Sequence, residues 1–285
     1  MKNCIITGGN SGIGFAAAMQ IAAKGCGVTL ICRNEVSAQN ACAKIISHSG
    51  NENVNYLIAD LAEMKAVRKA AAEYLDAGAS LDVLINNAAD FDLSVRSPIM
   101  TSDGMEKQFA TNVAAPFLLS KLLFSALRKS GDGRIINISS QGLCVYPFIK
   151  LDFDNLNGER SYNPSKTYYQ NKLALLMWSL YMADSQKDVK IQAVRVTNVK
   201  IDMSRYDHIH PLLKQMYRIK SKFSISPEEM ARVYTALAVT DSYSSFLYDE
   251  KLREVRANRS AYDKPAQKRL YELLCQKTAM NHSSD

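Results

Sequence analysis

Two tyrosine–lysine pairs with the same spacing are the residues of this chain best suited to acid–base chemistry. Tyr162 precedes Lys166 by four positions, and Tyr168 precedes Lys172 by four. A phenol with an ordinary pKa of about 10 releases its proton reluctantly at neutral pH, and a neighbouring ammonium lowers that pKa by favouring the phenolate. A pair on one helical face can therefore supply or remove a proton during catalysis.

A proline decides between the two pairs. Pro164 is accepted at the first position of a helix, with Asn163 as the capping residue before it. We therefore expect Tyr162 to lie outside the helix, whereas Tyr168 and Lys172 share a face one turn apart. Tyr168 is the predicted general acid/base, and Lys172 is predicted to lower its pKa.

A glycine-rich turn near the start of the chain has the composition of a phosphate-binding loop. The first apolar run ends in residues 7–14, Thr-Gly-Gly-Asn-Ser-Gly-Ile-Gly, and a helical stretch follows. Its glycines permit a tight turn, close approach of backbone to phosphate and close helix packing, while the helix N-terminus offers N–H donors. An ordinary tight turn is the alternative, but the position after the first strand favours a dinucleotide site formed by Gly8, Asn10, Ser11, Gly12, Ile13 and Gly14.

The end of the second apolar run indicates which nicotinamide cofactor binds. A cofactor with a free 2′-hydroxyl normally meets an acidic residue there, but this run ends in Arg33 and Asn34. A guanidinium suits a 2′-phosphate, so we predict NADP(H) over NAD(H), with a surface arginine as the alternative. Asp60, just before Leu61, is a candidate acceptor for the adenine amino group, and an N-cap of the next helix is the competing interpretation.

These motifs, in this order, resemble the short-chain dehydrogenase/reductase family. The resemblance rests on the glycine turn, Asn86-Asn87-Ala88-Ala89, Ile138-Ser139-Ser140 and the Tyr-x-x-x-Lys pair, and it covers nearly the whole chain. Residues 155–162 and 249–252 resemble its retinol-dehydrogenase-like branch. The resemblance implies a Rossmann fold, a cofactor that also contacts Asn87 and Ala88, and hydride transfer between the nicotinamide and a carbonyl or alcohol carbon.

The resemblance also implies roles for residues near the pair. Lys172 is expected to hold the nicotinamide ribose as well, and Ser140 to hydrogen-bond the substrate oxygen. Because side chains alternate along a strand, only one of Ser139 and Ser140 should face the site, and the alignment favours Ser140. Pro116 lacks the amide that would bond the Asn112 carbonyl. The matching asparagine in the family anchors a water that connects the lysine to solvent, so Asn112 is the expected proton relay, with a buried structural amide as the alternative.

Three segments depart from the family pattern. The Pro-Gly that usually follows the sixth strand is replaced by Val196-Thr197, and the threonine that often touches the nicotinamide amide is replaced by Ile201. Ala89 stands where the family usually has glycine, and its methyl group is expected to crowd the ribose pocket. Residues 241–245 replace the usual small residues before the last strand. The orientation of the cofactor is therefore less well specified than the rest of the site.

The elements that must position these residues follow from the alternation of apolar runs and helical stretches. Buried strands are expected at 4–6, 28–32, 54–59, 81–85, 134–138 and 191–196, and helices at 14–24, 35–47, 63–74, 105–129 and 165–183. Strands joined by crossover helices predict a doubly wound parallel sheet in a three-layer α/β/α arrangement. A further helix is expected after Ser226, with Pro227 at its first position.

We expect one domain over residues 1–285, with segments 143–165 and 199–225 covering the substrate. Both segments are rich in apolar and aromatic side chains, which favours a hydrophobic substrate, although these residues would equally well complete the core. The oligomeric state stays open, because dimers and tetramers are common in the family while this branch is often monomeric.

Composition excludes several other classes of protein. The 285 residues are 47% hydrophobic and 22% charged, as in an ordinary globular protein. No apolar run approaches the roughly 18 residues of a membrane span, and we expect no signal peptide, because a strand-like segment follows Met1 and Lys2 directly. Six scattered cysteines without a CxxC pair indicate reduced thiols in the cytoplasm rather than a metal site. The net charge of +7 is interspersed with acidic residues, which disfavours nucleic acid as a partner.

Two other functions fit the same fold. A protein that binds NADP(H) as a redox sensor without turnover would have lost the tyrosine or the lysine of the site, and both are present in this chain. An isomerase that uses transient hydride transfer resembles the extended branch of the family, which normally has a longer C-terminal substrate domain. We therefore expect an enzyme whose partner is a small carbonyl or alcohol compound.

Overall fold

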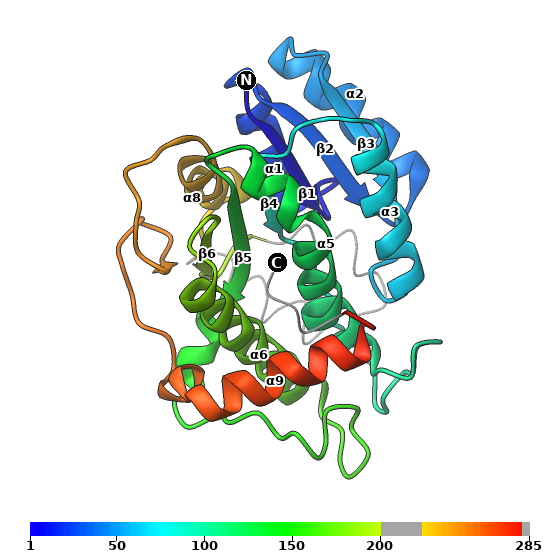
Figure 1. Ribbon diagram of the computed structural model, residues 1–285, viewed down its shortest axis with the longest axis vertical. Coiled ribbons are helices and arrows are strands. Elements are labelled where there is room, and N and C mark those ends of the chain that lie inside the picture. The colour runs from blue at the N-terminus through cyan, green and yellow to red at the C-terminus, as the bar shows by residue number, and fades with distance from the viewer. Residues whose placement is uncertain (201–223, 281–285) are drawn as a thin grey trace.

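The computed structural model describes residues 1–200 and 224–280, which are built around a seven-stranded parallel sheet (Figure 1). The strand order is β3-β2-β1-β4-β5-β6-β7. The strands are β1 (Asn3–Thr7), β2 (Gly27–Cys32), β3 (Val54–Ile58), β4 (Val83–Asn86), β5 (Arg134–Ser140), β6 (Lys190–Val196) and β7 (Leu247–Tyr248). Each of the six apolar runs expected to form a strand does so.

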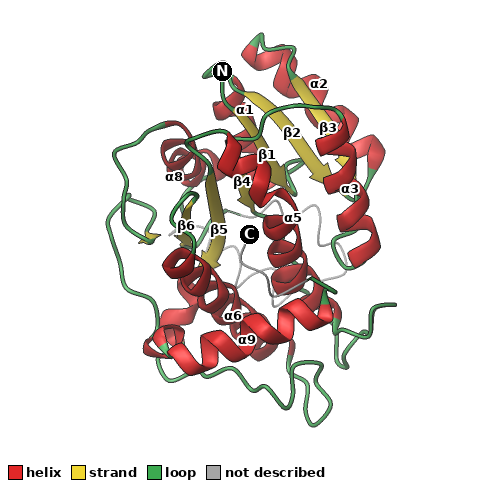
Figure 2. Cartoon of the chain, in the orientation of Figure 1, coloured by secondary structure: helices red, strands yellow, loops and turns green. Residues whose placement is uncertain are grey.

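Helices cover both faces of the sheet (Figure 2). One face packs against α1 (Gly12–Ala22), α2 (Glu35–Ser49) and α8 (Pro227–Val239). The other face packs against α3 (Met64–Asp76), α5 (Ala115–Lys129) and α6 (Pro164–Ser185), and α9 (Lys264–Lys277) lies along α6. This three-layer arrangement confirms the predicted doubly wound fold.

Central strands have apolar side chains on both sides because helices cover both faces. In β1, Ile5 belongs to the cluster under α3, α5 and α6, and Ile6 belongs to the cluster under α1, α2 and α8. Both side chains are fully buried. Continuous apolar runs in the sequence, rather than alternating ones, are therefore the correct signal for this sheet.

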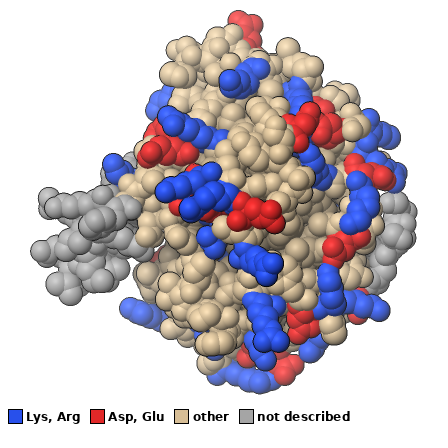
Figure 3. All heavy atoms as spheres, turned by 90° about the vertical axis from the view of Figure 1, so that its left-hand side faces the viewer, with Lys and Arg blue, Asp and Glu red and all other residues tan. Residues whose placement is uncertain are grey.

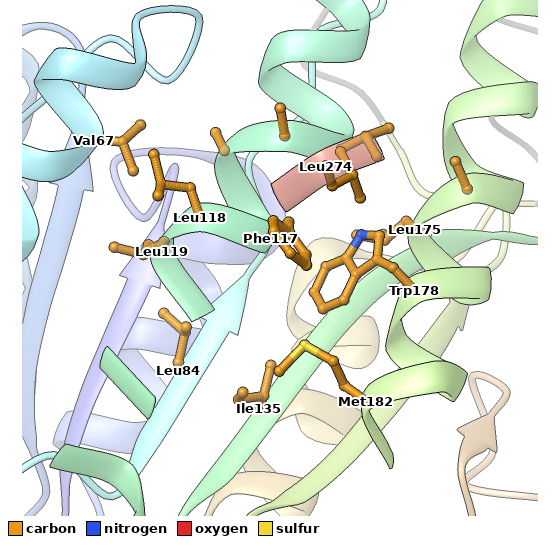
Figure 4. Close-up of a cluster of buried hydrophobic side chains, with 14 of the residues drawn as sticks. Val67, Leu84, Phe117, Leu118, Leu119, Ile135, Leu175, Trp178, Met182 and Leu274 are labelled. Atoms are coloured by element: carbon orange, nitrogen blue, oxygen red, sulfur yellow. The ribbon is translucent and has the colours of Figure 1, made fainter. Parts of the chain in front are cut away.

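Aromatic rings join α5, α6 and α9 in the larger of the two clusters. Figure 4 shows Phe117 of α5 and Trp178 of α6 within it, with Leu274 of α9 close by. The Phe117 ring meets the Trp178 ring edge-on, with centroids 5.7 Å apart, and meets the Tyr271 ring edge-on at 5.3 Å. Edge-to-face pairs of this kind add to the stabilisation from buried area. The packing fixes α6, the helix that carries the predicted catalytic pair, against the rest of the domain.

The stretch Lys107–Lys129 is the one helix within the described ranges that is long and apolar enough to cross a membrane. Its most apolar window is 72% buried inside the fold, and Phe117 and Leu118 are fully buried. We interpret it as a core helix. Length and composition alone do not exclude a span here, so the expected absence of one stays a prediction.

The start of one C-terminal helix was expected from its cap residues, and a second C-terminal helix was not expected. Ser226 and Glu229 form a capping box at the start of α8, as expected from Ser226 followed by Pro227. The apolar pattern did not predict α9, which begins after the capping residue Asp263. Most of the expected covering segment 199–225 lies outside the described residues.

Charged side chains of both signs are mixed on the surface. On the face shown in Figure 3, lysines and arginines alternate with aspartates and glutamates rather than gathering into one basic patch. Arg134 is an exception because it is buried, donating hydrogen bonds to Asp132, to Asp241 and to the Leu237 carbonyl at the end of α8. This guanidinium joins the start of β5 to the end of α8.

Candidate active site

The start of α6 places the predicted catalytic pair as expected. The Asn163 side chain accepts a hydrogen bond from the Lys166 amide at 2.9 Å, and Pro164 is the first helical residue. Tyr162 consequently lies outside the helix, where its hydroxyl donates to Glu106 and accepts from Gln108. The structure thus confirms the predicted helix start and commits the Tyr162 hydroxyl to another part of the fold.

Lys172 is held between the helix and the end of β5. Its side chain is buried, and its Nζ donates a hydrogen bond of 2.7 Å to the Ile138 carbonyl. The same Nζ lies 5.6 Å from the centroid of the Tyr168 ring. The structure therefore brings the phenol and the ammonium together at the carboxyl end of β5, where ligands bind in sheets of this topology.

The pKa of Tyr168 shifts in the opposite direction to the one expected. Burial raises it above the ordinary value of a tyrosine, and the neighbouring Tyr169 adds to the shift. Burial also lowers the pKa of Lys172 to about 8. The ammonium lies over the ring and bonds a carbonyl, so burial dominates. Burial thus outweighs the lowering that was expected from Lys172, and Tyr168 keeps its proton at neutral pH.

Of the two serines at the end of β5, Ser140, which was predicted to face the site, is the more exposed. Ser140 is half-buried and its Oγ accepts a hydrogen bond from the Gly142 amide at 3.1 Å. A hydroxyl that accepts in this way retains its own proton for donation. Ser139 is buried, with no partner for its Oγ among the described residues. Of the two serines, only Ser140 is partly exposed, in agreement with the expectation that one of them faces the site.

Asn112 lies in an irregular turn between two helical segments. A π-helical turn, η1 (Ala110–Ala114), joins α4 (Lys107–Phe109) to α5, with the Ala115 amide bonded to the Ala110 carbonyl. The irregularity expected from Pro116 is therefore present. The Asn112 side chain is buried and bonds both backbone groups of Asp90, at 2.7 Å and 2.8 Å. Its side chain thus has the structural role that was the alternative, while its carbonyl receives no amide from Pro116.

The glycine turn is closed against the end of β4. Gly8 and Gly12 have positive φ values of 64° and 56°, which favour glycine. A Cβ on Gly14 would lie 2.4 Å from the Asn87 Nδ2 and 2.6 Å from the Gly8 carbonyl oxygen. Asn87 in turn donates to the Thr7 carbonyl at 3.0 Å. Side chains are excluded here, as in a loop whose backbone lies against a phosphate.

The turn retains groups that can bind a cofactor. The Thr7 hydroxyl accepts hydrogen bonds from the Asn87 and Ala88 amides, both at 3.0 Å, which joins β1 to β4. Ser11 is the N-cap of α1 but its side chain makes no capping bond. Helix N–H groups beside a glycine turn fit a pyrophosphate, so the residues here suit a dinucleotide.

The residues expected to contact the adenosine end of the cofactor lie at the carboxyl ends of β2 and β3, along the same edge of the sheet as the glycine turn. Arg33 directly follows β2, is exposed, and makes no ion pair or hydrogen bond with another described residue. Asn34 caps α2 by accepting from the Ser37 amide at 2.9 Å. Asp60 accepts from the Ala62 amide at 2.9 Å, and Leu61 is buried.

The competing interpretation of Asp60 is wrong. Glu63, rather than Asp60, is the N-cap residue of α3, which begins at Met64. The Asp60 carboxylate instead forms a short turn of its own. One of its oxygens therefore stays available at the sheet edge, where the candidate adenine contact would lie.

Aromatic contacts around Tyr168 were missed by sequence reasoning. The Phe91 ring lies 4.2 Å from the Tyr168 ring, and the Tyr169 ring lies 5.3 Å from it, edge-on. Tyr169 in turn contacts Tyr146, and a Cβ on Gly142 would overlap the Tyr169 ring. Phe91 follows the Asn-Asn-Ala-Ala segment closely, which was the only signal in the sequence that could have located it.

The departures from the family pattern are partly visible. Thr197 donates a hydrogen bond to the Gln141 side chain, so the segment after β6 is tied to the residue after Ser140. Ala89 is exposed. Ile201 lies outside the described residues. Arg134 bonds Asp241 of the unusual loop before β7.

Comparison with known proteins identifies the family. The model of the short chain dehydrogenases matches residues 2–151. Human retinol dehydrogenase 13 is 32% identical over 95% of this chain and 82% of its own length. The chain belongs to the short-chain dehydrogenase family. Human retinol dehydrogenase 14 is 31% identical over 95% of this chain and 84% of its own length, which confirms the retinol-dehydrogenase-like branch.

Solved structures of other short-chain dehydrogenases share the fold. An uncharacterised protein from Mycobacterium paratuberculosis superposes with a TM-score of 0.72 at 23% identity, covering 99% of this chain and 95% of its own. An alcohol dehydrogenase from Thermococcus sibiricus, complexed with 5-hydroxy-NADP, has a TM-score of 0.65 at 17% identity and covers 90% and 99%. This short-chain dehydrogenase is therefore an oxidoreductase of a family that uses a nicotinamide cofactor.

Proposed function

We propose that this short-chain dehydrogenase transfers hydride between NADP(H) and the carbonyl or alcohol carbon of a hydrophobic small molecule. The observation that carries the proposal is the pair formed by Tyr168 and Lys172. The ammonium is fixed by the Ile138 carbonyl and lies 5.6 Å from the phenol ring. The pair lies at the sheet edge where the turn that contains Gly8, Gly12 and Gly14 also lies.

Tyr168 exchanges the proton in the proposed reaction. When bound, the nicotinamide supplies or accepts the hydride. The phenol is protonated at neutral pH, as a general acid for carbonyl reduction requires, and because burial raises its pKa, proton donation depends on groups that stabilise the phenolate. Ser140 donates a hydrogen bond from its hydroxyl to the same substrate oxygen and so stabilises developing negative charge. Proton donation leaves a phenolate, which the Lys172 ammonium stabilises. In the oxidative direction this phenolate takes the alcohol proton and becomes the phenol again.

Lys172 and Asn112 return protons to Tyr168 in this scheme. Lys172 has a pKa of about 8, close enough to neutrality to exchange a proton readily. Asn112 fixes the backbone of Asp90 beside the site through two hydrogen bonds. Its backbone carbonyl is the proposed anchor of the water that connects Lys172 to solvent.

Arg33 supports NADP(H) over NAD(H). It follows β2 at the position where an acidic residue would meet a free 2′-hydroxyl. Its guanidinium is exposed and has no carboxylate partner within the described ranges, so it can bind a phosphate without breaking an ion pair. The alcohol dehydrogenase of similar fold was solved with an NADP derivative.

The surroundings of Tyr168 support a hydrophobic substrate. Phe91 and Tyr169 contact its ring directly, and Tyr146 extends the aromatic surface. Phe148 is 90% exposed on the nearby loop. Apolar side chains beside the reacting groups favour an apolar ligand because its transfer from water releases free energy in proportion to the buried area.

We also propose a reducing compartment, the cytosol, as the site of action. All six cysteines are free and five of them are buried. Buried thiols act as small apolar side chains and are stable where disulfides do not form.

Turnover by matched tyrosine variants tests the proposal. The protein is incubated with NADPH or NADH and a panel of hydrophobic aldehydes and ketones. We expect NADPH to be preferred and Tyr168→Phe to lower the rate by about 10²-fold or more, because a positioned proton donor is lost. Tyr162→Phe, whose hydroxyl bonds Glu106 instead, should change the rate little.

Cofactor binding separates loss of chemistry from loss of structure. Tyr168→Phe should still bind NADPH, measured by nucleotide fluorescence. Equal loss of rate from both tyrosine variants would contradict the assignment of Tyr168. A wild-type protein that binds NADPH but turns over no carbonyl or alcohol would favour the non-catalytic sensor instead.

A further inference from the structure

An exposed apolar turn follows the end of β5. Residues 145–149, Val-Tyr-Pro-Phe-Ile, come after Ser140 by way of the short helix η2 (Gln141–Val145) and include no charged side chain. Val145 is 76% exposed and Phe148 is 90% exposed, and Tyr146 between them is 38% exposed. Single apolar residues on a surface are ordinary, whereas neighbouring ones indicate an interaction surface.

Hydrogen bonds hold this turn in a fixed shape. The Ile149 amide donates to the Tyr146 carbonyl at 3.1 Å, which closes a β-turn with Pro147 and Phe148 at its centre. The Asn258 side chain donates to the same carbonyl at 2.9 Å, and Ile149 packs against the larger core cluster. Phe148 is therefore presented to solvent by a turn that is anchored on both sides.

Basic residues surround the turn. Lys150 and Lys166 line the same surface depression as the turn, and Asp152 is the acidic residue of that lining. Arg256 and Arg259 flank the asparagine that bonds the turn. All four cations are exposed, and none forms an ion pair with a described carboxylate. An uncharged apolar turn among unpaired cations has the composition of a surface that binds anionic lipid.

We propose that this surface binds an anionic lipid bilayer, with Val145 and Phe148 inserted at the boundary of headgroups and acyl chains. The two side chains are thereby removed from water. The lysines and arginines are attracted to the surface potential over about 10 Å, so they need not converge on one phosphate. Because the turn follows Ser140 by way of η2, binding brings the end of β5 near the bilayer, where hydrophobic compounds concentrate.

Cosedimentation with vesicles tests the inference. The protein is mixed with vesicles of phosphatidylcholine, with or without phosphatidylserine. We expect binding that requires phosphatidylserine and weakens as salt is raised. Val145→Asp/Phe148→Asp should weaken it by about 10²-fold, because two apolar side chains no longer enter the bilayer. Absence of wild-type binding, or equal binding by this variant, would overturn the inference.

Variants of charge and position supply the controls. Lys150→Gln/Lys166→Gln should weaken vesicle binding by about thirtyfold, because each lysine near an anionic surface contributes to the affinity. Leu75 is 41% exposed and lies at the end of α3, on the opposite edge of the sheet, where β4 begins. Leu75→Asp should therefore bind vesicles as wild type does, and an equal loss in this variant would contradict the assignment. Circular dichroism verifies that each variant is folded.

A fluorophore in the turn distinguishes insertion from adsorption. Trp178, the single tryptophan, is fully buried, so Phe148→Trp adds an exposed reporter whose indole suits a membrane interface. Its emission should shift to shorter wavelength on phosphatidylserine vesicles and be quenched by brominated lipid. Binding without that shift would overturn the inserted turn.

The same variants distinguish a membrane surface from an interface between copies of the chain. If vesicles do not bind and sedimentation velocity shows a dimer that Phe148→Asp dissociates, the turn joins two copies and the inference is wrong. The inference adds an interaction surface to the proposed oxidoreductase. Since vesicle binding is measured without turnover, its failure leaves NADPH-dependent reduction unaffected, and loss of reduction leaves vesicle binding unaffected.

Discussion

Lys172 is a buried ammonium whose main partner is a backbone carbonyl. It is 3% exposed, and the Ile138 carbonyl accepts its hydrogen bond. Burial lowers its pKa to about 8 from an ordinary 10.5, and burial raises that of Tyr168. Both shifts favour the neutral form of the side chain. The phenol is therefore protonated at neutral pH and holds its proton more tightly than an exposed tyrosine does.

Replacement of Lys172 should change how stability depends on pH. The folded-state pKa lies below the unfolded value, so the unfolded chain binds this proton more tightly and stability rises with pH between about 8 and 10.5. We expect wild type to gain about 2 kcal/mol from this group between pH 7.5 and 9.5. Lys172→Met should lack that gain.

Urea unfolding followed by the fluorescence of Trp178, the single tryptophan, measures this difference. When the two proteins are compared at each pH, the contributions of the cysteines and other shared groups to the free energy of unfolding cancel. Parallel pH profiles for wild type and variant would show that Lys172 is fully solvated.

At the scale of elements, contacts between the ends of strands and helices hold the site in place. The Asn163 cap fixes where α6 begins and so fixes which tyrosine shares a face with Lys172. The π-helical turn at Ala110–Ala114 places Asn112 beside the segment after β4. Arg134 joins β5 to the end of α8 through buried hydrogen bonds. Each contact sets the position of an element whose end lies at or near the site.

Removal of the Arg134 guanidinium should destabilise the fold. Arg134→Met leaves the Leu237 carbonyl without its donor and breaks the bonds to Asp132 and Asp241. We expect a loss of about 2–3 kcal/mol in the free energy of unfolding, because buried acceptors lose their partner. Arg160→Met is the matched control. Arg160 is 62% exposed in its pair with Asp154, so its loss should cost about 1 kcal/mol or less. Equal costs would contradict the structural role of Arg134.

The whole molecule forms the site by bringing the carboxyl ends of its parallel strands to one edge. Gly8 follows β1, Arg33 follows β2, Asn87 follows β4 and Ser140 ends β5. These residues are far apart in the chain and become neighbours because the strands are parallel and their connections cross the faces. The cofactor should therefore stabilise the whole domain by binding segments from both halves of the sheet.

Thermal unfolding with cofactor tests this integration. NADPH at 100 times its Kd should stabilise the folded state by about 2.7 kcal/mol, which raises Tm by roughly 5 °C or more. Arg33→Gln should lose the advantage of NADPH over NADH, whereas the exposed Lys44→Gln in α2 should keep it. Gly14→Ala should abolish the shift with both nucleotides, because its Cβ would lie 2.4 Å from Asn87. A full NADPH shift in Gly14→Ala would contradict the predicted cofactor site.

The sequence by itself determined the features that depend on neighbours in the chain. Apolar runs located the six longer strands, and Asn163-Pro164 and Ser226-Pro227 located two helix starts, because caps and proline act within one turn. The choice of Tyr168 over Tyr162 and the position of the glycine turn follow from the same local rules. The start of α9 has the same kind of local signature, with Asp263 as its cap and Leu270, Tyr271 and Leu274 at helical spacing, so this helix was overlooked rather than hidden by tertiary effects.

Only the tertiary structure decided what depends on residues distant in the chain. The direction of the Tyr168 pKa shift depends on burial by Phe91 and Tyr169, and spacing along α6 predicts the ammonium but not that burial. The hydrogen bonds between Asn112 and Asp90 and those of Arg134 likewise join separate segments. Burial and long-range hydrogen bonds depend on how the layers pack, which no local pattern specifies.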